Sequence, residues 1–312
     1  IQLDSMTGSP ASNFNPSADY TLRIAGYGTM TGYDPANFVI NTNAFPGCTT
    51  NWSITNMNSS LYLVYRGAGL LFTNSFKWAD PSNGFWSVGM NWTNGSAPNA
   101  GGDGTYVLEF SGAFGQPAYY STNDLGTFLL NQLLLTSLNL PSVTNVLAGN
   151  PLVFTNAGAR VDYSGWGSYK ITNAIWLADD TIFGGAGAGG PLVLSNSVTG
   201  GRALTKQGPW TLVLQGSNSF ADPVVVSGGA NGIIRIENTN ALGTSSIIVT
   251  NGGRLHGTLP FTLSYDRTAR VTGGGSLWTN GGALTVGSNA QLVVDNGGRL
   301  AVANALTVNA YG

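Results

Sequence analysis

Few side chains in this sequence could carry out acid–base, nucleophilic or metal chemistry. His256 is the single histidine and Cys48 the single cysteine of the 312 residues, which excludes a histidine-rich metal site and an internal disulfide. Asp179 and Asp180 form the one adjacent carboxylate pair, and paired acids can serve acid–base catalysis or hold Ca²⁺. Because neighbouring side chains of a strand point to opposite faces, a shared site is disfavoured, and we expect the pair to cap a turn.

The other titratable candidates also favour structural roles. His256 follows Leu255 in an alternating run, so we expect a surface or stacking residue. Cys48 has no histidine near it in the sequence, which favours a buried apolar thiol over a nucleophile, with an intermolecular disulfide as the alternative. Asp103 and Asp295 lie beside glycine or asparagine and are expected to be turn residues rather than ligands.

Two kinds of side chain could bind carbohydrate. Arg254 and Arg299 each follow a Gly-Gly pair, with Ser276 expected between them in the stack, and could bind an anionic glycan along one face; solvated corner positions are the favoured alternative. Tryptophans could provide platforms for sugars, although we expect core or interface packing for most of them. These tryptophans are Trp78, Trp86, Trp92, Trp166, Trp176, Trp210 and Trp278. The sequence therefore predicts no catalytic residue, no cofactor and no metal site.

A repeat in residues 204–308 would position these side chains. Val226, Val249, Val271 and Val294 recur at intervals of 23, 22 and 23 residues. Each valine precedes a corner rich in Gly and Asn, and two further short apolar runs follow within the same period. Three short strands in each period of 22 to 23 residues predict a parallel β-solenoid, in which every turn of the chain, or coil, stacks on the previous one.

The corners are predicted from glycine and asparagine, which tolerate positive φ. Walking the period backwards suggests Leu204, Ile182, Val161 and Leu140 as earlier positions in the stack. Eight coils at about 4.8 Å each would give a rod section roughly 35–40 Å long. The residues predicted to form the stack and its turns are Val226, Gly229, Val249, Asn251, Gly252, Val271, Gly274, Val294, Asn296 and Gly297.

The composition agrees with an all-β surface protein. Only 8% of residues are charged and 45 are glycine, so the strong helix formers of helical surfaces are scarce. A net charge of −2 without a basic run disfavours a nucleic-acid partner, and no apolar stretch reaches the roughly 18–20 residues of a membrane helix. The thiol-poor, Thr- and Asn-rich composition suits an extracellular or cell-surface location.

Three regions differ in their patterns. Residues 1–66 predict a small β-rich module, cap-like or docking-like, with a strand at 20–24 and a hairpin formed by 51–55 and 61–65. Residues 67–127 are expected to be a junction that leads into the β-helix, and residues 128–312 the parallel β-helix itself. We expect residues 1–127 to cover or dock on an end of the stack, whose unpaired strands would otherwise be a template for further strands.

Two stretches resemble bacterial autotransporter-associated β-strand repeat proteins. The first contains Phe85-Trp86, Asn91-Trp92, Pro98-Asn99, Gly102-Asp103 and Phe110. The second runs from Leu204 to Asn218 and is similar to the repeat core L-x-K-x-G-x-G-x-L-x-L-x-G-x-N, from which Pro209 and Trp210 depart. The resemblance implies a right-handed, passenger-like β-helix of a large bacterial surface protein, and implies an architecture more than an activity.

Residues 1–66 resemble the closing segment of such modules, which places an ending before a β-helix. Either the chain is part of a longer tandem-repeat protein, or copies self-assemble head to tail as a homopolymer. Because the sequence starts at Ile1 without Met or a signal peptide, we expect a mature product or a segment of a longer protein.

These patterns support three hypotheses about function. The first is a non-enzymatic structural protein, a β-solenoid subunit of an extracellular filament or giant surface protein, whose partners are copies of itself. The second is a surface adhesin that binds glycans along the solenoid face. The third and weakest is a β-helical polysaccharide lyase, because no convergent group of acid and base is evident in the sequence.

Overall fold

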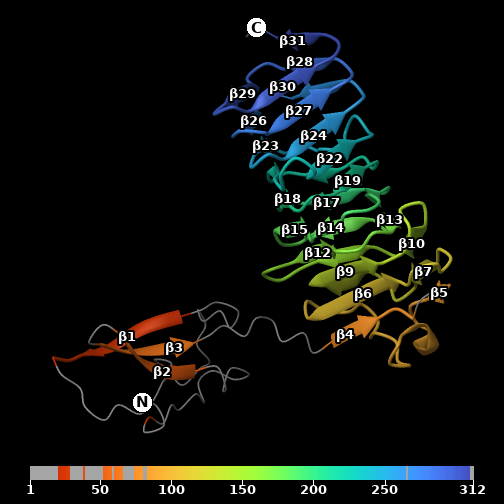
Figure 1. Cartoon of the computed structure of the whole chain (residues 1–312), viewed down its shortest axis with the longest axis vertical. Helices are drawn as coiled ribbons and strands as arrows, with labels where there is room; N and C mark the ends of the chain where they lie inside the picture. Colours follow the sequence, from red (N-terminus) through yellow and green to blue (C-terminus); the bar gives the residue numbers. More distant parts are fainter. Residues whose placement is uncertain are drawn as a thin grey trace. The chain divides into compact units, whose positions relative to one another are not determined.

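The computed structural model describes residues 20–28, 38, 52–57, 60–65, 74–79, 83–264 and 266–309. The chain divides into two compact units, Ile1–Leu71 and Phe72–Gly312, each described by itself below (Figure 1). Apart from the short 3-10 turn η2 (Gly89–Asn91), the regular elements of the described residues are β-strands. No helix in this part of the chain is long and apolar enough to span a membrane. Cys48 lies outside the described residues.

The first unit contains a three-stranded antiparallel sheet. Its strands are β1 (Tyr20–Gly26), β2 (Trp52–Met57) and β3 (Ser60–Tyr65), in the order β1-β3-β2. β2 and β3 pair antiparallel, as the hairpin predicts. The sheet buries a small apolar cluster of Ile54, Leu61 and Leu63, with Tyr27 and Phe38 packed against it.

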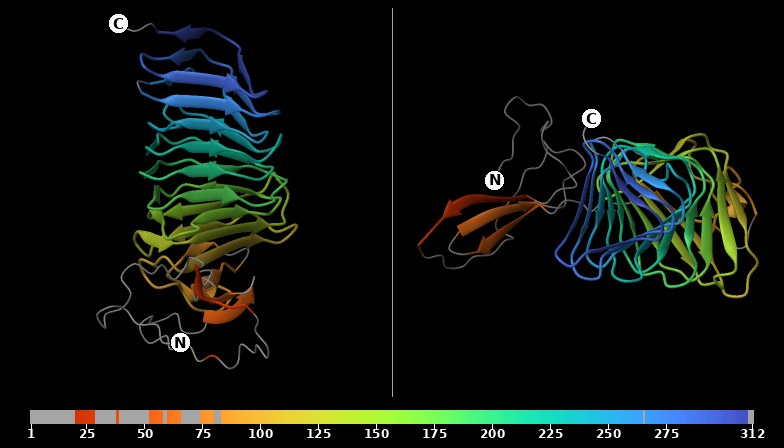
Figure 2. Two further views of the ribbon diagram at one scale, coloured as in Figure 1. Left: turned by 90° about the vertical axis from the view of Figure 1, so that its left-hand side faces the viewer. Right: turned by 90° about the horizontal axis from the view of Figure 1, so that it is seen from above.

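The second unit is a parallel β-solenoid, which confirms the predicted fold class, at about 23 residues per turn (Figure 2). Its first face is a ten-stranded sheet. In chain order the strands are β4 (Asn74–Lys77), β6 (Tyr106–Gly112), β9 (Gln132–Ser137), β12 (Arg160–Tyr163), β15 (Thr181–Gly184), β18 (Leu204–Lys206), β21 (Val224–Val226), β23 (Ile247–Val249), β26 (Thr268–Thr272) and β29 (Gln291–Asp295).

The second face is also a ten-stranded parallel sheet. Its strands are β5 (Gly84–Phe85), β7 (Tyr120–Asn123), β10 (Thr144–Gly149), β13 (Ser168–Ile171), β16 (Leu192–Leu194), β19 (Thr211–Leu214), β22 (Ile233–Ile236), β24 (Arg254–Gly257), β27 (Leu277–Asn280) and β30 (Arg299–Val302).

The third face is divided into two sheets. The five-stranded part contains β8 (Phe128–Leu130), β11 (Leu152–Phe154), β14 (Ile175–Leu177), β17 (Val198–Gly200) and β20 (Ser219–Phe220). The three-stranded part contains β25 (Phe261–Leu263), β28 (Leu284–Val286) and β31 (Leu306–Val308).

Successive coils pair residue by residue in the later part of the solenoid. Val226 lies beside Val249, Val249 beside Val271, and Val271 beside Val294, all on the first face. Ten strands stacked at about 4.8 Å per step span roughly 43 Å.

The registers predicted for the earlier coils are wrong. Leu204 pairs with Val224, so Lys206 is the residue that lies beside Val226. The two residues before Val226 in β21 are equally apolar, and the coil is shorter than the assumed period. Ile182 pairs with Thr205 and points outward, so it too is not a stack residue.

The earliest predicted position differs more strongly. Val161 lies in the stack, but it pairs with Leu133 and not with Leu140. Leu140 lies between β9 and β10 and is 52% exposed. The chain takes 28 residues from Leu133 to Val161, because the loop that contains Leu140 lengthens this coil. The stack also extends through β6 and β4, beyond the eight predicted coils.

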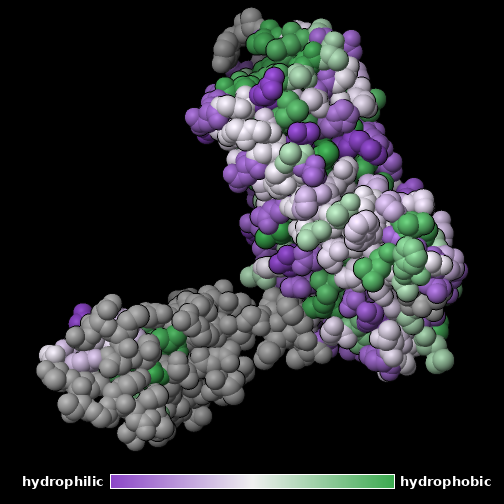
Figure 3. Space-filling model, viewed as in Figure 1, coloured by the Kyte–Doolittle hydropathy of each residue, from purple (hydrophilic) through white to green (hydrophobic). Residues whose placement is uncertain are grey.

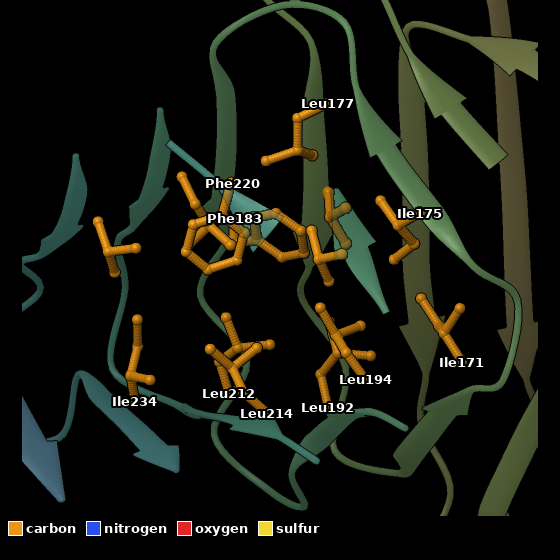
Figure 4. Close-up of a cluster of buried hydrophobic side chains, with 14 of the residues drawn as sticks. Ile171, Ile175, Leu177, Phe183, Leu192, Leu194, Leu212, Leu214, Phe220 and Ile234 are labelled. Carbon is orange, nitrogen blue, oxygen red and sulfur yellow. The ribbon is translucent and has the colours of Figure 1, made fainter. Parts of the chain in front are cut away.

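Alternation along each strand places aliphatic side chains in the interior. Leu192, Leu194, Leu212, Leu214 and Ile234 project inward from three successive strands of the second face and are almost completely buried (Figure 4). Burying each such side chain contributes about 1.5–3 kcal/mol. Because a coil borders only its neighbours, this burial depends on a coil above and a coil below.

The end of the solenoid at β4 is sealed by aromatic rings from residues 78–92. Trp78, Trp86 and Trp92 are buried, and the ring centroids of Trp78 and Trp92 lie 5.1 Å apart in a T-shaped contact. The segment also covers the backbone edge of β4, since Thr93 N donates to Lys77 O at 2.9 Å and Ala79 N to Asn91 O at 2.8 Å. The chain itself therefore closes this end, which we call the aromatic seal.

Candidate functional site: the open end of the solenoid

The last described coil has no strand beyond it. β29, β30 and β31 are edge strands of their sheets within the described residues. Each therefore has one backbone edge whose N–H and C=O groups meet no neighbouring strand, which is the arrangement that accepts further strands. We call this surface the open end; its inward-facing side chains are Leu292, Val294, Leu300, Val302, Leu306 and Val308.

The open end exposes side chains that earlier coils bury. Val294, Leu306 and Val308 are 43%, 49% and 69% exposed. Their partners one coil earlier, Val271, Leu284 and Val286, are at most 4% exposed. The chemistry of each pair is nearly the same, so the missing coil accounts for the difference. Apolar side chains are also prominent at this end of the surface view (Figure 3).

The predicted turn residues form a column of glycines at one corner of the solenoid. Gly229, Gly252 and Gly297 adopt φ of 70°, 74° and 84°. A Cβ at Gly252 would lie 3.2 Å from Gly229 Cα, so the corners of successive coils are in close contact. Asn251 and Asn296 also adopt positive φ, 50° and 47°, as asparagine tolerates.

Gly274, also predicted as a turn residue, does not require glycine. The positive φ values of its corner belong to Gly273 and Gly275, at 85° and 82°. This corner contains one residue more than the neighbouring corners, and the extra residue shifts the register that follows. Arg254 and Arg299 consequently have Leu277 between them, and the expected Ser276 is buried instead.

The carboxylates serve turns and surface ion pairs. Asp179 Oδ1 accepts from Asp180 N at 2.9 Å, and Asp180 Oδ1 accepts from Ala203 N in the next coil at 3.1 Å, so both oxygens cap backbone. Asp103 Oδ1 accepts from Thr105 N at 2.8 Å. No group of three His, Cys, Asp or Glu side chains suited to a metal occurs among the described residues.

Asp295 is the last residue of β29 and pairs with Arg270 of the preceding coil. Arg270 Nη2 lies 2.7 Å from Asp295 Oδ2, and this guanidinium, with Thr272, lowers the pKa of the carboxyl group. The ion pair is largely exposed, so it contributes little to stability.

His256 and most tryptophans lie in the stack. His256 faces outward and its Nδ1 lies 2.8 Å from Thr279 Oγ1 of the next coil. Trp210 and Trp278 are buried, as are the tryptophans of the aromatic seal, whereas Trp166 and Trp176 are 59% and 54% exposed. The structure does not bring these residues together in one site.

Lys206 is a buried cation that the sequence patterns did not single out. It occupies the inward position between Phe183 and Val226, where neighbouring coils have apolar residues. Its Nζ donates to Gln207 O at 2.7 Å and Gly208 O at 2.8 Å, and lies 3.9 Å from the centre of the Trp210 ring. Burial lowers the pKa of Lys206 to about 7. A lysine three residues into the L-x-K-x-G motif was the available signal.

Comparisons with protein families, with curated proteins and with solved structures found no match for this chain.

Proposed function

We propose that the chain is a structural, non-enzymatic protein of the bacterial cell surface, a β-solenoid subunit of an extracellular filament whose copies join head to tail. The observation that carries the proposal is the open end, where aliphatic side chains of three edge strands are exposed although their counterparts one coil earlier are buried. The surface location is supported by the charge-poor composition and by the resemblance to surface-protein repeats.

The occupant of the open end is a second copy of the chain. A contact between one end of a copy and a different surface of the next does not close on itself, and such contacts generate filaments. The aromatic seal covers the opposite end of the solenoid, so the complementary surface is assigned to the first unit. There β1 is an edge strand, and its Leu22 and Ile24 are 50% and 39% exposed.

The proposal predicts that charge at the open end weakens self-association. In the variant Leu306→Lys/Val308→Lys, two exposed aliphatic side chains of β31 become cations that a second copy would have to bury. Each aliphatic side chain contributes about 1.5–3 kcal/mol on burial, so we expect association at least about tenfold weaker. Sedimentation velocity over a range of protein concentrations measures the effect.

Thr307→Lys is the matched control. Thr307 lies on the same strand between the two substituted residues, points outward and is exposed. It adds charge without changing the inward surface, so its association should equal that of the unmodified protein. Equal association of all three proteins, or a monomer at every concentration, would contradict the proposal.

A glycan-binding surface adhesin is the second candidate function. A polar hollow on the third face favours it and is the subject of the next section.

A further inference from the structure

The third face of the solenoid is interrupted between β20 and β25. Residues 237–246 replace a strand with turns there. Ala241 and Leu242 of this segment are buried in the core, and Gly243 adopts φ of 55°. The segment therefore keeps its inward contacts but does not pair as a strand, which divides the third face into its five-stranded and three-stranded parts.

The interruption leaves a hollow of about 410 Å³ on the surface. This volume lies within the range of small-ligand sites, about 300–1,000 Å³. Most of its lining side chains carry a hydroxyl, an amide or a guanidinium group, and none of those described carries a carboxylate. The polar lining residues are Ser217, Asn218, Thr239, Asn240, Thr244, Thr262, Ser264 and Arg267.

The walls of the hollow are held by both neighbouring coils. From the preceding coil, the buried Asn218 donates through Nδ2 to Ala241 O at 2.6 Å and through its backbone N to Asn240 O at 3.1 Å. From the following coil, Arg267 Nη1 donates to Gly243 O at 2.7 Å. The turn is thus fixed before any ligand arrives, which lowers the entropic cost of binding.

Arg267 is the single cation that lines the hollow among the described residues. It forms no salt bridge with a described carboxylate, unlike Arg160, Arg235 and Arg270. One guanidinium N–H is used on Gly243, and the other N–H groups have no acceptor among the described residues. Desolvation lowers the pKa of the guanidinium from its usual value, but arginine stays charged in proteins. A carboxylate is the partner that a guanidinium fork binds best, together with phosphate.

We propose that this hollow binds an acidic saccharide, with the carboxylate of a uronic acid on Arg267 and the sugar hydroxyls on the amide and hydroxyl groups around it. Hydroxyl and amide side chains can both donate and accept, as a sugar ring requires. The exposed Asn240, Thr244 and Thr262 supply such groups on the rim. The site lies away from the open end, so the inference does not depend on head-to-tail assembly.

The test is isothermal titration of the 312-residue protein with tetra-galacturonate and with its methyl ester, which retains the hydroxyls but has no charge. We expect binding of the acid and at least about tenfold weaker binding of the ester. Arg267→Gln should weaken binding of the acid to a similar extent. Acetate serves as a third ligand, and binding of acetate as tight as that of the tetrasaccharide would overturn the assignment to a sugar.

Two further variants keep the test independent of folding. Asn240→Asp places a negative charge on the exposed rim, away from the core, and should also weaken binding of the acid at least about tenfold. Arg254→Gln removes an exposed arginine of the second face and should leave binding unchanged. No binding of tetra-galacturonate, equal binding of acid and ester, or loss of binding with Arg254→Gln would each overturn the proposal.

Discussion

At the scale of single residues, Lys206 is the most unusual feature of the solenoid. A cation occupies an inward position that Phe183 and Val226 fill in the adjacent coils. Two corner carbonyl groups and the face of Trp210 partly replace the water that the ammonium group loses. The residue therefore links the strand β18 to the corner that follows it, at the cost of a buried charge.

This burial predicts a dependence of stability on pH. The folded pKa of Lys206 is lowered to about 7, whereas lysine in an unfolded chain titrates near ~10.4. Between these values the unfolded chain holds more protons, so the free energy of unfolding should rise as the pH rises from about 7 towards 10 and change little below 7. Urea unfolding followed by tryptophan fluorescence at several pH values measures this rise.

Lys206→Met should remove the rise that Lys206 causes, and Lys170→Met is the control. Lys170 is a half-buried, outward-facing residue of β13, so its variant should keep the pH dependence of the unmodified protein. If the free energy of unfolding of Lys206→Met rises with pH as steeply as that of the unmodified protein, the buried ammonium is not its source.

At the scale of elements, the glycine corners determine where each coil turns. Gly252→Ala introduces a side chain at φ of 74° and 3.2 Å from Gly229 Cα. Left-handed backbone costs a non-glycine residue about 1–2 kcal/mol, so we expect at least that loss in the free energy of unfolding. Thermal and urea unfolding of the purified variant give the measurement.

Gly274→Ala provides the comparison within the same column of corners. Gly274 has no positive φ, and an added Cβ would meet no atom within 4 Å. This substitution should be close to neutral. A loss for Gly274→Ala as large as that for Gly252→Ala would show that backbone conformation is not what these corners require.

The same elements show how far the sequence predicts the structure. The late coils have a valine at one position and glycine beside it in every period, and there the register of Val226, Val249, Val271 and Val294 follows from spacing alone. The earlier coils vary in length, and Lys206 stands where an apolar residue was expected, so spacing misplaced Leu204 and Leu140. One added residue beside Gly274 displaced Ser276 in the same way.

The candidate sites were predictable to different degrees. The open end follows from the repeat, since any last coil exposes the inward residues of its strands. The hollow around Arg267 depends on a strand that residues 237–246 do not form. Its lining residues come from three coils and share no spacing, so no sequence pattern could assemble them.

At the scale of the whole solenoid, the two ends differ. The β4 end is closed by tryptophan rings and backbone hydrogen bonds from residues 78–93. The other end leaves three strand edges and their aliphatic side chains uncovered within the described residues. In a structure whose coils are stabilised by their neighbours, this asymmetry gives the solenoid a direction, and growth by addition at one end is the assembly that it supports.

Electron cryo-microscopy of the purified 312-residue protein tests the central claim most directly. We predict filaments of regularly repeating subunits, in which the solenoid strands lie across the filament with a spacing of about 4.8 Å along its axis. Discrete rods of single copies at all protein concentrations would contradict head-to-tail assembly through the open end.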